Sequence, residues 1–572
     1  MLGLAVSRPA RADKLDVRAK YEEGLVRAAL SRHGLVVDPA PEGKTIEAII
    51  IDASNVILRG ELPLSNKIPW TWLNHLHMRT RDPVVQRELL FAAGEAYRAD
   101  LVEESARNLR NLFILSVARI VAARGSSPDR VVILVMTKDQ WSLRLNTDFV
   151  LDQARLDTLS FSFAEENVAG RNKRASIEFA LDPGRYLLGV GYNDPRVWGS
   201  RVFAGATVDV YLNRLTNNAE GGYGALSIGS PLYSLHTEWA WDASFAFLQD
   251  KFRLFQGGDI AELKIGNELV PYIYARKRVS AVLEGIHSWG VVNKVNVTAG
   301  VRYDSNLYQL TDDIPASVSR GAREAFLGIL PRTEDAAGPF VAFQYYRSDY
   351  IKLKDIDTFA LTEDFRLGPL VNLSVRYAYP MFNIESNFVE LNASYAHLHY
   401  FRGNLLGYSA GVSARIQEGV LPGTVLVNEE AAATLHEITP RFGPFRLHLA
   451  GAFRFRNHDL NHTVFVLGSS TRLRGYETQA FAGNSFYVTN VELRTVALNL
   501  WTLHVGAVLF YDGGGAPVTL AALSWHQDAG IGLRILIPQF NRGVLRLDLA
   551  FPFEVPSGGW VPRFSAEFGQ AF

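Results

Sequence analysis

The chain has 572 residues, with 58 Lys or Arg and 59 Asp or Glu, so its formal net charge is −1. This balance argues against nucleic acid as the main partner, because phosphate binding requires a net or clustered positive charge. The absence of cysteine excludes disulfides, thiolate metal ligands and a cysteine nucleophile. An aromatic content of 11% is too high for a disordered chain.

The first residues resemble the end of a secretory signal peptide. The apolar residues 2–6 precede Ala10-Arg11-Ala12, and the charged residues Asp13 and Lys14 follow. Signal peptides are usually cleaved after two small residues separated by one residue of any type, and Ala10-Arg11-Ala12 matches this pattern. We therefore expect cleavage after Ala12. The basic start of a signal peptide is missing, so residues 1–12 are interpreted as a truncated signal peptide, with a frayed N-terminus as the alternative.

Residues 13–138 have the pattern of a small α+β domain preceded by a helical segment. Residues 13–44 form the helical segment, and residues 45–138 form the domain. Asp82 is expected to cap a helix whose first turn contains Pro83. The predicted elements are, in chain order, a helix over 15–33, a strand over 46–58, a helix over 82–91, a helix over 101–112, and strands over 114–121 and 131–137 with a turn over 125–129 between them.

From Trp141 onward, apolar and polar residues alternate with a period of two. In residues 445–456, one face carries Phe, Leu and Gly, and the other carries Arg, His and Ala. Residues 501–512 and 544–551 repeat the pattern, which places Asp512, Arg546 and Asp548 on polar faces. Such segments of about ten residues, separated by turns, are typical of a transmembrane barrel.

A membrane-spanning helix needs about 20 consecutive apolar residues, and the chain has no such run. The longest candidate, Phe113 to Ala123, is too short and contains Arg119. A soluble β-sandwich also alternates, but the polar faces carry many full charges, as a water-filled lumen permits. The sequence therefore predicts a mainly β fold, with a transmembrane antiparallel barrel of roughly 16 strands over residues 139–572.

The last residues alternate in the same way and end on an aromatic side chain. Phe564, Phe568 and Phe572 share one face with Ala566 and Gln570. A final strand that ends on a phenylalanine resembles the recognition signal of bacterial outer-membrane barrels.

A loop between two predicted strands narrows the family. Residues 466–476 read Val-Leu-Gly-Ser-Ser-Thr-Arg-Leu-Arg-Gly-Tyr, and a Phe-x-Asp-x-Gly pattern follows at residues 510–514. Together with the terminal phenylalanine, these motifs resemble the BamA/TamA family of outer-membrane assembly and translocation barrels, also called the bacterial surface antigen family. The resemblance covers nearly the whole chain.

The resemblance implies roles for the residues of both motifs. The loop that contains Arg474, Gly475 and Tyr476 would fold back into the lumen, where Arg474 would engage an acidic residue of the wall. The matching wall residue is Asp512, within the pattern that includes Phe510 and Gly514. Arginine can bind a carboxylate through two parallel hydrogen bonds, so a charge swap between Arg474 and Asp512 is expected to restore the pair.

The region before the barrel resembles the polypeptide-transport-associated (POTRA) domain of the same family. Residues 88–97 and 104–109 match its helix-Gly-helix centre. Only one complete unit is present, over residues 45–138, whereas family members usually carry several. The helix over 15–33 is left over, either as a docking segment or as part of a degenerate second unit.

The remaining candidate sites favour structural interpretations. His397 and His399, like His458 and His462, lack further metal ligands at a defined spacing. The glycine-rich residues 221–224 lack the strand, turn and helix context of a phosphate loop. No catalytic constellation, metal or cofactor is predicted, and the chain is not expected to be an enzyme. The tryptophans 239, 241, 501 and 560 fit the aromatic girdles of a barrel.

The resemblance implies a location in the bacterial outer membrane, with the N-terminal domain in the periplasm. The expected partners are the lipid bilayer, unfolded outer-membrane or secreted client proteins, and accessory periplasmic proteins. A lateral seam is expected between residues 141–149 and 564–572. The alternative is a passive or gated pore, or an envelope protein that handles lipid or small solutes.

Overall fold

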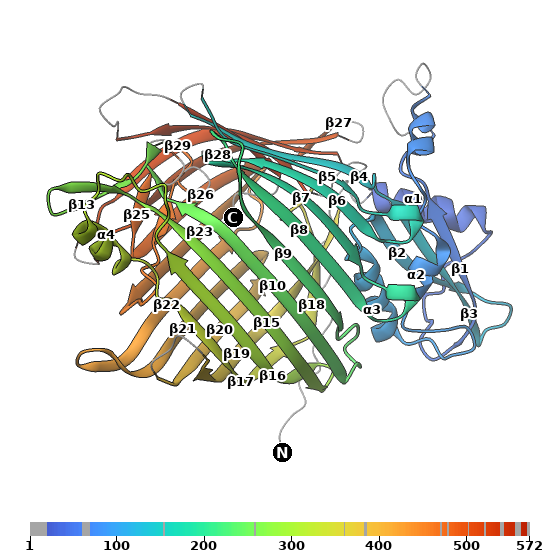
Figure 1. The fold of residues 1–572 in the computed structure, drawn as a ribbon. Coiled ribbons are helices and arrows are strands. Elements are labelled where there is room, and N and C mark those ends of the chain that lie inside the picture. The colour runs from blue at the N-terminus through green and yellow to red at the C-terminus, as the bar shows by residue number, and fades with distance from the viewer. Residues whose placement is uncertain are drawn as a thin grey trace.

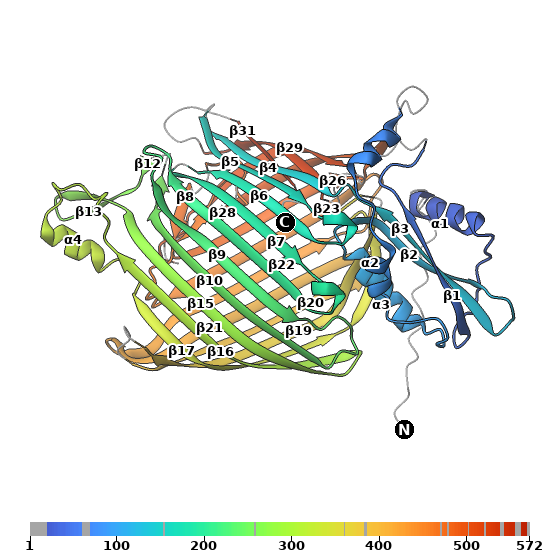
Figure 2. The same cartoon turned by 45° about the vertical axis from the view of Figure 1, so that its right-hand side comes forward.

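The computed structural model describes residues 20–568, except for 60–68, 153–154, 183, 257–258, 360, 382–385, 469–471, 478–479, 501–502, 520–521, 538–542 and 555–561. These residues form a front domain, residues 20–139, at one end of a large closed barrel (Figures 1 and 2). We call that end of the barrel the domain end, and the opposite end the far end. The expected signal peptide, residues 1–12, and Phe572 lie outside the described residues.

The front domain is built on a three-stranded sheet. Its strands are β1 (Thr45–Ser54), β3 (Arg130–Asp139) and β2 (Leu115–Arg124), in this spatial order. β1 runs parallel to β3, and β2 runs antiparallel to it. Helices α2 (Asp82–Arg87) and α3 (Ala99–Arg110) bury their apolar residues against one face of the sheet. The element order is the predicted one, with boundaries that differ by a few residues.

Helix α1 (Lys20–Arg32) packs against the other face of the sheet, where Ala29 meets Val117 and Leu134. The chain that follows α1 adds a short strand to the outer edge of β2. The Asp38 N–H donates to the carbonyl of Ala122 (3.0 Å), and the Arg124 N–H donates to that of Val36 (2.8 Å). The leftover helix therefore covers the sheet as a docked segment of the front domain.

Two details of the front domain differ from the sequence predictions. Asp82 lies in the first turn of α2, and the N-cap position is occupied by Arg81, whose side chain makes no capping hydrogen bond. The short helix Trp70–Leu76 was not predicted. Residue His77, directly after it, is buried against Asp139 and Ser142, at the connection to the barrel.

The barrel is a single closed antiparallel sheet, which confirms the mainly β prediction. In the described residues its strands are, in chain order, β4 (Leu143–Asp152), β5 (Arg155–Glu165), β6 (Arg174–Leu181), β7 (Arg185–Asp194), β8 (Phe203–Asn213), β9 (Ala219–Ser230), β10 (Trp239–Arg253), β15 (Ile273–Trp289), β16 (Asn293–Gln309), β17 (Glu334–Arg347), β18 (Asp349–Lys354), β19 (Thr362–Pro380), β20 (Phe388–Phe401), β21 (Asn404–Leu421), β22 (Thr424–Ile438), β23 (Phe445–Asn457), β26 (Ser485–Thr495), β27 (Leu498–Leu500), β28 (Leu503–Gly515), β29 (His526–Leu536), β30 (Leu545–Pro552) and β31 (Arg563–Phe568).

The prediction of roughly 16 strands is too low. Strands β17 and β18 pair in succession with β19, and β26 and β27 pair in succession with β28, so the 22 strands of the described chain occupy 20 positions around the wall. The estimate assumed long loops at one end. Several far-end connections are instead very short, such as residues 153–154 between β4 and β5, which leaves room for more strands.

The far end also carries a small folded extension. It contains β11 (Phe255–Gln256), β12 (Asp259–Ile260), β13 (Glu262–Ile265), β14 (Glu268–Pro271) and helix α4 (Arg320–Leu327), which projects at the left of Figure 1. Phe326 of α4 is fully buried among apolar residues that include Val270 and Tyr274. The side chain of Ser319 caps α4 by accepting from the Ala322 N–H.

The two faces of the wall differ as the alternation predicts. In β23, Phe445 and Phe453 face outward and are 37% exposed, whereas His448 and Ala450 face inward and are buried. Elsewhere on the outer face, large aliphatic side chains are half exposed. Among the described helices, none is long and apolar enough to cross a membrane.

The front domain is attached to the domain end of the barrel through ion pairs, which we call the docking interface. Arg110 of α3 binds Asp364 of β19 with two hydrogen bonds of 2.6 and 2.8 Å. Glu88 binds Arg196 at 2.8 Å. Glu103 and Lys352 form a third ion pair, which is exposed to solvent. The front domain is thus held across the barrel opening from several sides.

Helix α1 contacts the barrel as well as the sheet. The carboxylate of Glu22 accepts hydrogen bonds from the N–H and the hydroxyl of Thr362, at 3.1 and 2.8 Å. The guanidinium of Arg119 on β2 lies 3.2 Å from the same carboxylate. Glu22 therefore joins three parts of the molecule: α1, the front sheet and the barrel.

Candidate functional site

A loop from the far end of the barrel folds into the lumen between β23 and β26. It begins and ends in a small hairpin, in which β24 (Phe465–Leu467) pairs with β25 (Phe481–Gly483). The Leu473 side chain is fully buried in a cluster that also contains Tyr476 and Val488 of the wall. Apolar packing thus holds the loop against the inner face of β26.

Arg474 lies at the centre of the site, with a side chain that is only 2% exposed. Its Nε donates to Asp512 Oδ2 at 2.7 Å, and its Nη2 donates to Asp512 Oδ1 at 2.8 Å. Its Nη1 donates to Glu492 Oε1 at 2.6 Å and to Asp548 Oδ2 at 3.2 Å. The guanidinium also lies 3.6 Å above the centre of the Phe510 ring. One arginine thereby joins the loop to strands β26, β28 and β30.

The neighbours of Arg474 explain why the loop contains Gly and Tyr. A Cβ atom on Gly475 would lie 2.5 Å from the Cβ of Asp528, so a larger residue would push the loop off the wall. The Tyr476 hydroxyl donates to the carbonyl of Gln527 at 2.9 Å and accepts from the N–H of the same residue at 3.1 Å. Both residues therefore set the depth of the loop against β29.

The wall pattern has a similar close approach. A Cβ atom on Gly514 would lie 2.5 Å from the carbonyl oxygen of Tyr487 on the neighbouring strand β26. Asp512 faces inward and is fully buried, as the alternation predicts. The structure therefore brings Arg474, Asp512 and Phe510 into direct contact, while Gly514 lies at the interface between β26 and β28.

Further polar residues of the site were not singled out from the sequence. Asn490 donates to Asp512 Oδ1 at 2.7 Å and to the carbonyl of Arg472 at 2.8 Å. Arg534 lies 2.5 Å from Asp548 and 3.4 Å from Glu492. The alternation places these residues inward, but it does not say which of them adjoin. We call Arg474, Glu492, Asp512, Asp548 and Arg534 the loop cluster.

One carboxylate beside the loop cluster differs from the others. Asp528 on β29 is the register partner of Asp512 on β28, and both are fully buried. Among the described residues, neither oxygen of Asp528 has a hydrogen-bond partner of ordinary geometry. A buried carboxylate without a donor is costly, particularly beside a second carboxylate. Asp528 lies against Gly475 of the loop, and among the described residues it forms no ion pair with Arg474 of the kind that Asp512 forms.

The terminal strand is only partly described. Phe564 faces outward and is 41% exposed. Phe568 pairs with Leu545 on β30 through the backbone, and its side chain lies outside the described positions, as does Phe572. β31 pairs with β4 through Ser565 and Val150 and through Ala566 and Phe149.

The other candidates from the sequence lie apart from the loop cluster. The rings of His397 and His399 stack on each other at 3.8 Å on β20. His458 lies 2.8 Å from Glu429. In the part of the chain that the structure describes, no three His, Asp or Glu side chains are placed to hold a metal ion. The geometry of the loop cluster serves to hold a loop in place.

Comparison with known families identifies the class of the region that contains the loop cluster. Residues 367–572, from β19 to the end of the chain, match the Omp85 superfamily domain. This is the superfamily of outer-membrane assembly and translocation barrels that the loop and the terminal strand resemble. The predicted resemblance is therefore confirmed for this part of the chain. No curated protein sequence matches the chain.

Solved structures that match the chain share little sequence with it. CdiB from Escherichia coli has a TM-score of 0.43 and 10% identity, covering 98% of this chain and 100% of that one. BamA from Haemophilus ducreyi lacking POTRA domains 1–3 has a TM-score of 0.36 and 10% identity, covering 92% and 84%. CdiB from Acinetobacter baumannii has a TM-score of 0.39 and 11% identity, covering 94% and 78%.

Proposed function

We propose that the chain is an outer-membrane barrel that assists the insertion, folding or export of other polypeptides, with the front domain in the periplasm. The observation that carries this proposal is the loop cluster. It fixes a far-end loop inside the lumen through fully buried ion pairs, within the region that matches the Omp85 superfamily domain. A loop held in this way narrows the lumen and leaves the wall itself as a route for clients.

The outer wall supports the membrane location. Leu283, Val301 and Val341 on neighbouring strands point outward and are 54–56% exposed, which would be unfavourable in water. Trp239 and Trp241 lie on the outer face near the domain end, where a girdle of interfacial aromatic residues is expected. Trp501 and Trp560, which were assigned to such girdles from the sequence, lie outside the described residues.

The front domain offers client chains one edge of its sheet more readily than the other. The edge of β2 is already paired with residues 36–38, through Val36 and Asp38. On the opposite edge, the described backbone hydrogen bonds to β1 from outside the sheet involve only Thr45 and Ile46. We therefore assign β-augmentation by clients to the remainder of β1.

The junction between β4 and β31 is the candidate lateral exit. It joins the first and last strands of the barrel, where Val150 pairs with Ser565 and Phe149 with Ala566. Because the chain contains no cysteine, a disulfide can be introduced at this junction without competition from native thiols. The pair Val150→Cys and Ser565→Cys should abolish function under oxidation and restore it under reduction. The control pair Ser160→Cys and Ala180→Cys, within β5 and β6, should leave function intact.

The main test of the function is depletion of the protein, followed by a census of outer-membrane and secreted proteins. A specific subset of barrels or secreted proteins should fall at least fivefold and recover with the wild-type chain. An Arg474→Ala chain should fail to restore them, whereas Arg320→Ala, at a site 91% exposed on α4, should restore them. Unchanged levels of every other barrel and secreted protein would refute the proposal.

The second candidate function is a passive or gated pore. Cavities of about 850 and 520 Å³ along the inner wall favour it, because the lumen is not completely filled by side chains. Conductance in planar bilayers separates the two functions. A large, steady conductance would favour the pore, and low, flickering conductance would favour an assembly barrel that is obstructed by its inner loop and front domain.

A further inference from the structure

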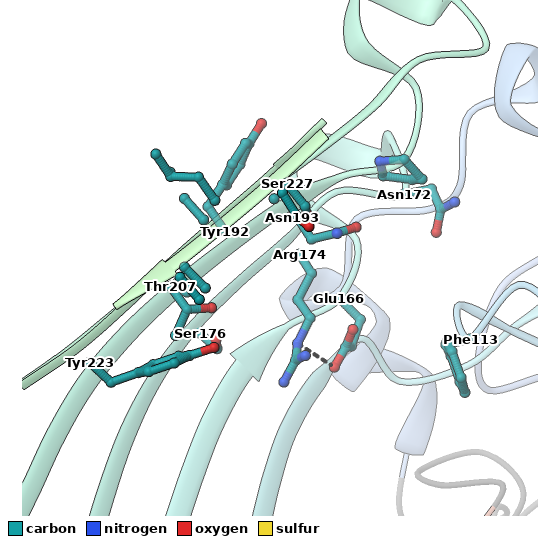
Figure 3. A pocket seen from close by; sticks show the side chains of 18 of the residues that line it. Phe113, Glu166, Asn172, Arg174, Ser176, Tyr192, Asn193, Thr207, Tyr223 and Ser227 are labelled. Carbon is teal, nitrogen blue, oxygen red and sulfur yellow. Dashed lines mark ion pairs between the residues drawn. The ribbon is translucent and has the colours of Figure 1, made fainter. Parts of the chain in front are cut away.

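The larger cavity lies where the front domain meets the inner wall of the barrel; we call it the vestibule. It has a volume of about 850 Å³ and is lined by residues 111–114 of the front domain and by the inner face of β6–β10 and β15. Figure 3 shows Phe113 on one side of the ion pair between Arg174 and Glu166, with Tyr223 and Ser176 on the other side.

The barrel side of the vestibule is rich in hydroxyl groups. Ser176, Thr207, Ser227, Ser244 and Ser280 line it from five different strands. Hydroxyl groups both donate and accept hydrogen bonds, so they can pair with the N–H and carbonyl groups of an extended main chain whatever its sequence; that of Ser280 already donates to Asp304 at 3.1 Å and can still accept.

Glycines open the wall between these hydroxyl groups. A Cβ atom on Gly191 would lie 2.7 Å from the Ser176 hydroxyl, and one on Gly205 would lie 3.1 Å from the Ser227 hydroxyl. The charged groups of the vestibule include the pair of Arg174 and Glu166 at 3.3 Å, in which each charge offsets the other. Arg144, which donates to the carbonyl of Phe113, is a further cation of the lining, and the hydroxyl-bearing wall favours a hydrogen-bonding ligand.

The front-domain side adds one apolar contact. Phe113 is 70% exposed and lies among the residues that line the vestibule. Its carbonyl accepts a hydrogen bond from Arg144 of β4, and the carbonyl of Ile114 accepts from the Gln140 N–H at 2.8 Å. The Phe113 ring is therefore presented on a loop that is anchored to the first strand of the barrel.

We propose that the vestibule binds an extended segment of client polypeptide, with its main chain on the hydroxyl-lined wall and a large apolar or aromatic side chain on Phe113. This inference rests on the proposed function and names the class of ligand at the barrel entrance. A neutral oligosaccharide could also use hydroxyl groups and an aromatic ring. The anchoring of Phe113 to β4, a strand of the candidate exit, favours the polypeptide.

The test uses a photoreactive phenylalanine analogue at position 113 of the full-length protein in lipid nanodiscs. The probe is a biotinylated peptide with the sequence of residues 563–572, which contains three phenylalanines. Trp198, 98% exposed on a domain-end loop and not part of the vestibule lining, is the matched control position. Light should produce at least ten times more peptide adduct from position 113 than from position 198.

Two variations define the site further. A probe with serine in place of all three phenylalanines should give at least fivefold less adduct. Phe113→Ala should weaken binding of the unmodified peptide at least tenfold in fluorescence anisotropy, while Phe113→Trp should stay within threefold of the wild type. Since Phe113 is largely exposed, both variants should retain the folded, heat-modifiable barrel, which is checked by gel mobility.

The proposal is overturned by equal adduct at both positions, by unchanged binding in Phe113→Ala, or by displacement of the peptide with maltohexaose at millimolar concentration. The depletion census separates this inference from the proposed function. If depletion lowers the levels of other outer-membrane proteins but no peptide adduct forms, only the vestibule inference is refuted. If the adduct forms but depletion leaves all other barrels and secreted proteins unchanged, the assembly function is refuted instead.

Discussion

Two regions of this molecule hold parts together with charged pairs that differ in their exposure to water. In the loop cluster, Arg474 and its three acidic partners are at most 2% exposed. In the docking interface, side-chain exposure ranges from 7% and 11% for Arg110 and Asp364 to 44% and 46% for Lys352 and Glu103. Water can replace a lost partner only where it has access. The loop should therefore be fixed, and the front domain should be releasable.

The largest expected effect is that of Arg474→Ala. Its removal leaves Asp512 buried without its bidentate cation and takes one of the cations from Glu492, which keeps Arg494 at 2.6 Å, so the free energy of unfolding should fall by about 3–5 kcal/mol. Urea unfolding in lipid vesicles measures this loss, and protease access to residues 472–477 reports release of the loop. Arg320→Ala, on the exposed surface of α4, should change stability by less than about 0.5 kcal/mol. A loss below about 1 kcal/mol for Arg474→Ala would contradict a structural role for the cluster.

The charge swap Arg474→Asp with Asp512→Arg should recover less than half of that loss. The sequence alone predicts restoration, because it identifies a single pair. The structure adds Glu492 and Asp548 beside Arg474, and a carboxylate at position 474 would face both. Comparison of the double variant with each single variant by the same urea titration measures the recovery. Complete recovery would show that Asp512 is the dominant partner.

Arg110→Ala should have an intermediate effect on the docking interface. Arg110 is mostly buried and binds Asp364 with two hydrogen bonds, so docking should weaken by about 1.5–3 kcal/mol. Lys352→Ala, which removes an exposed pair, should cost less than about 1 kcal/mol. Hydrogen exchange in α3 measures docking while the barrel strands serve as an internal reference. Equal effects for the two variants would remove the distinction between the two regions.

Asp528→Asn should be nearly neutral or stabilising, although the residue is fully buried. Asp528 lies opposite Asp512 and both are fully buried, so an amide of the same shape relieves the repulsion between two adjacent carboxylates. Asp512→Asn, by contrast, should destabilise the loop because it weakens the contact with Arg474. The same urea titration distinguishes them, and an equal loss for both variants would contradict these roles.

The smallest expected effect is a dependence on pH in the front domain. The Lys44 ammonium and the Ala40 N–H donate to Asp38, which lowers the pKa of that carboxyl. A lowered pKa in the folded state stabilises residues 36–38 at neutral pH, and this contribution is lost as the pH falls below about 4. Exchange of the Arg124 amide, corrected for its intrinsic rate at pH 6 and pH 3, measures the change. Equal protection at both pH values would contradict it.

The sequence predicts which face of the wall a side chain occupies better than it predicts which residues lie beside that side chain. Alternation places Asp512, Asp548 and Arg546 on inner faces, and all three are buried there. It does not give the register between strands, which brings Asn490 beside Asp512 and places Asp528 on its other side. Contacts between strands that are distant in the sequence depend on this register.

The strand number and the front-domain contacts were also beyond the reach of local patterns. The strand number depends on loop lengths, and connections as short as residues 153–154 leave little signal in composition. The short helix Trp70–Leu76 spans only seven residues, too few to show a helical period in the sequence, and it leads into His77, which contacts Asp139 more than 60 residues away. Phe113 can be singled out as a vestibule residue only after the structure places the barrel wall across the cavity from it.

The contacts of Glu22 have a mechanical consequence. The chain connects the front domain to the barrel through residues 139–142, and the contact of Glu22 with Thr362 acts in parallel with this connection and with the ion pairs of the docking interface. A front domain with one connection can rotate about it, whereas one with several must break the others before it rotates. A force that pulls on the chain before α1 would act directly on the contacts of Glu22. Breaking these contacts would help to release the front domain.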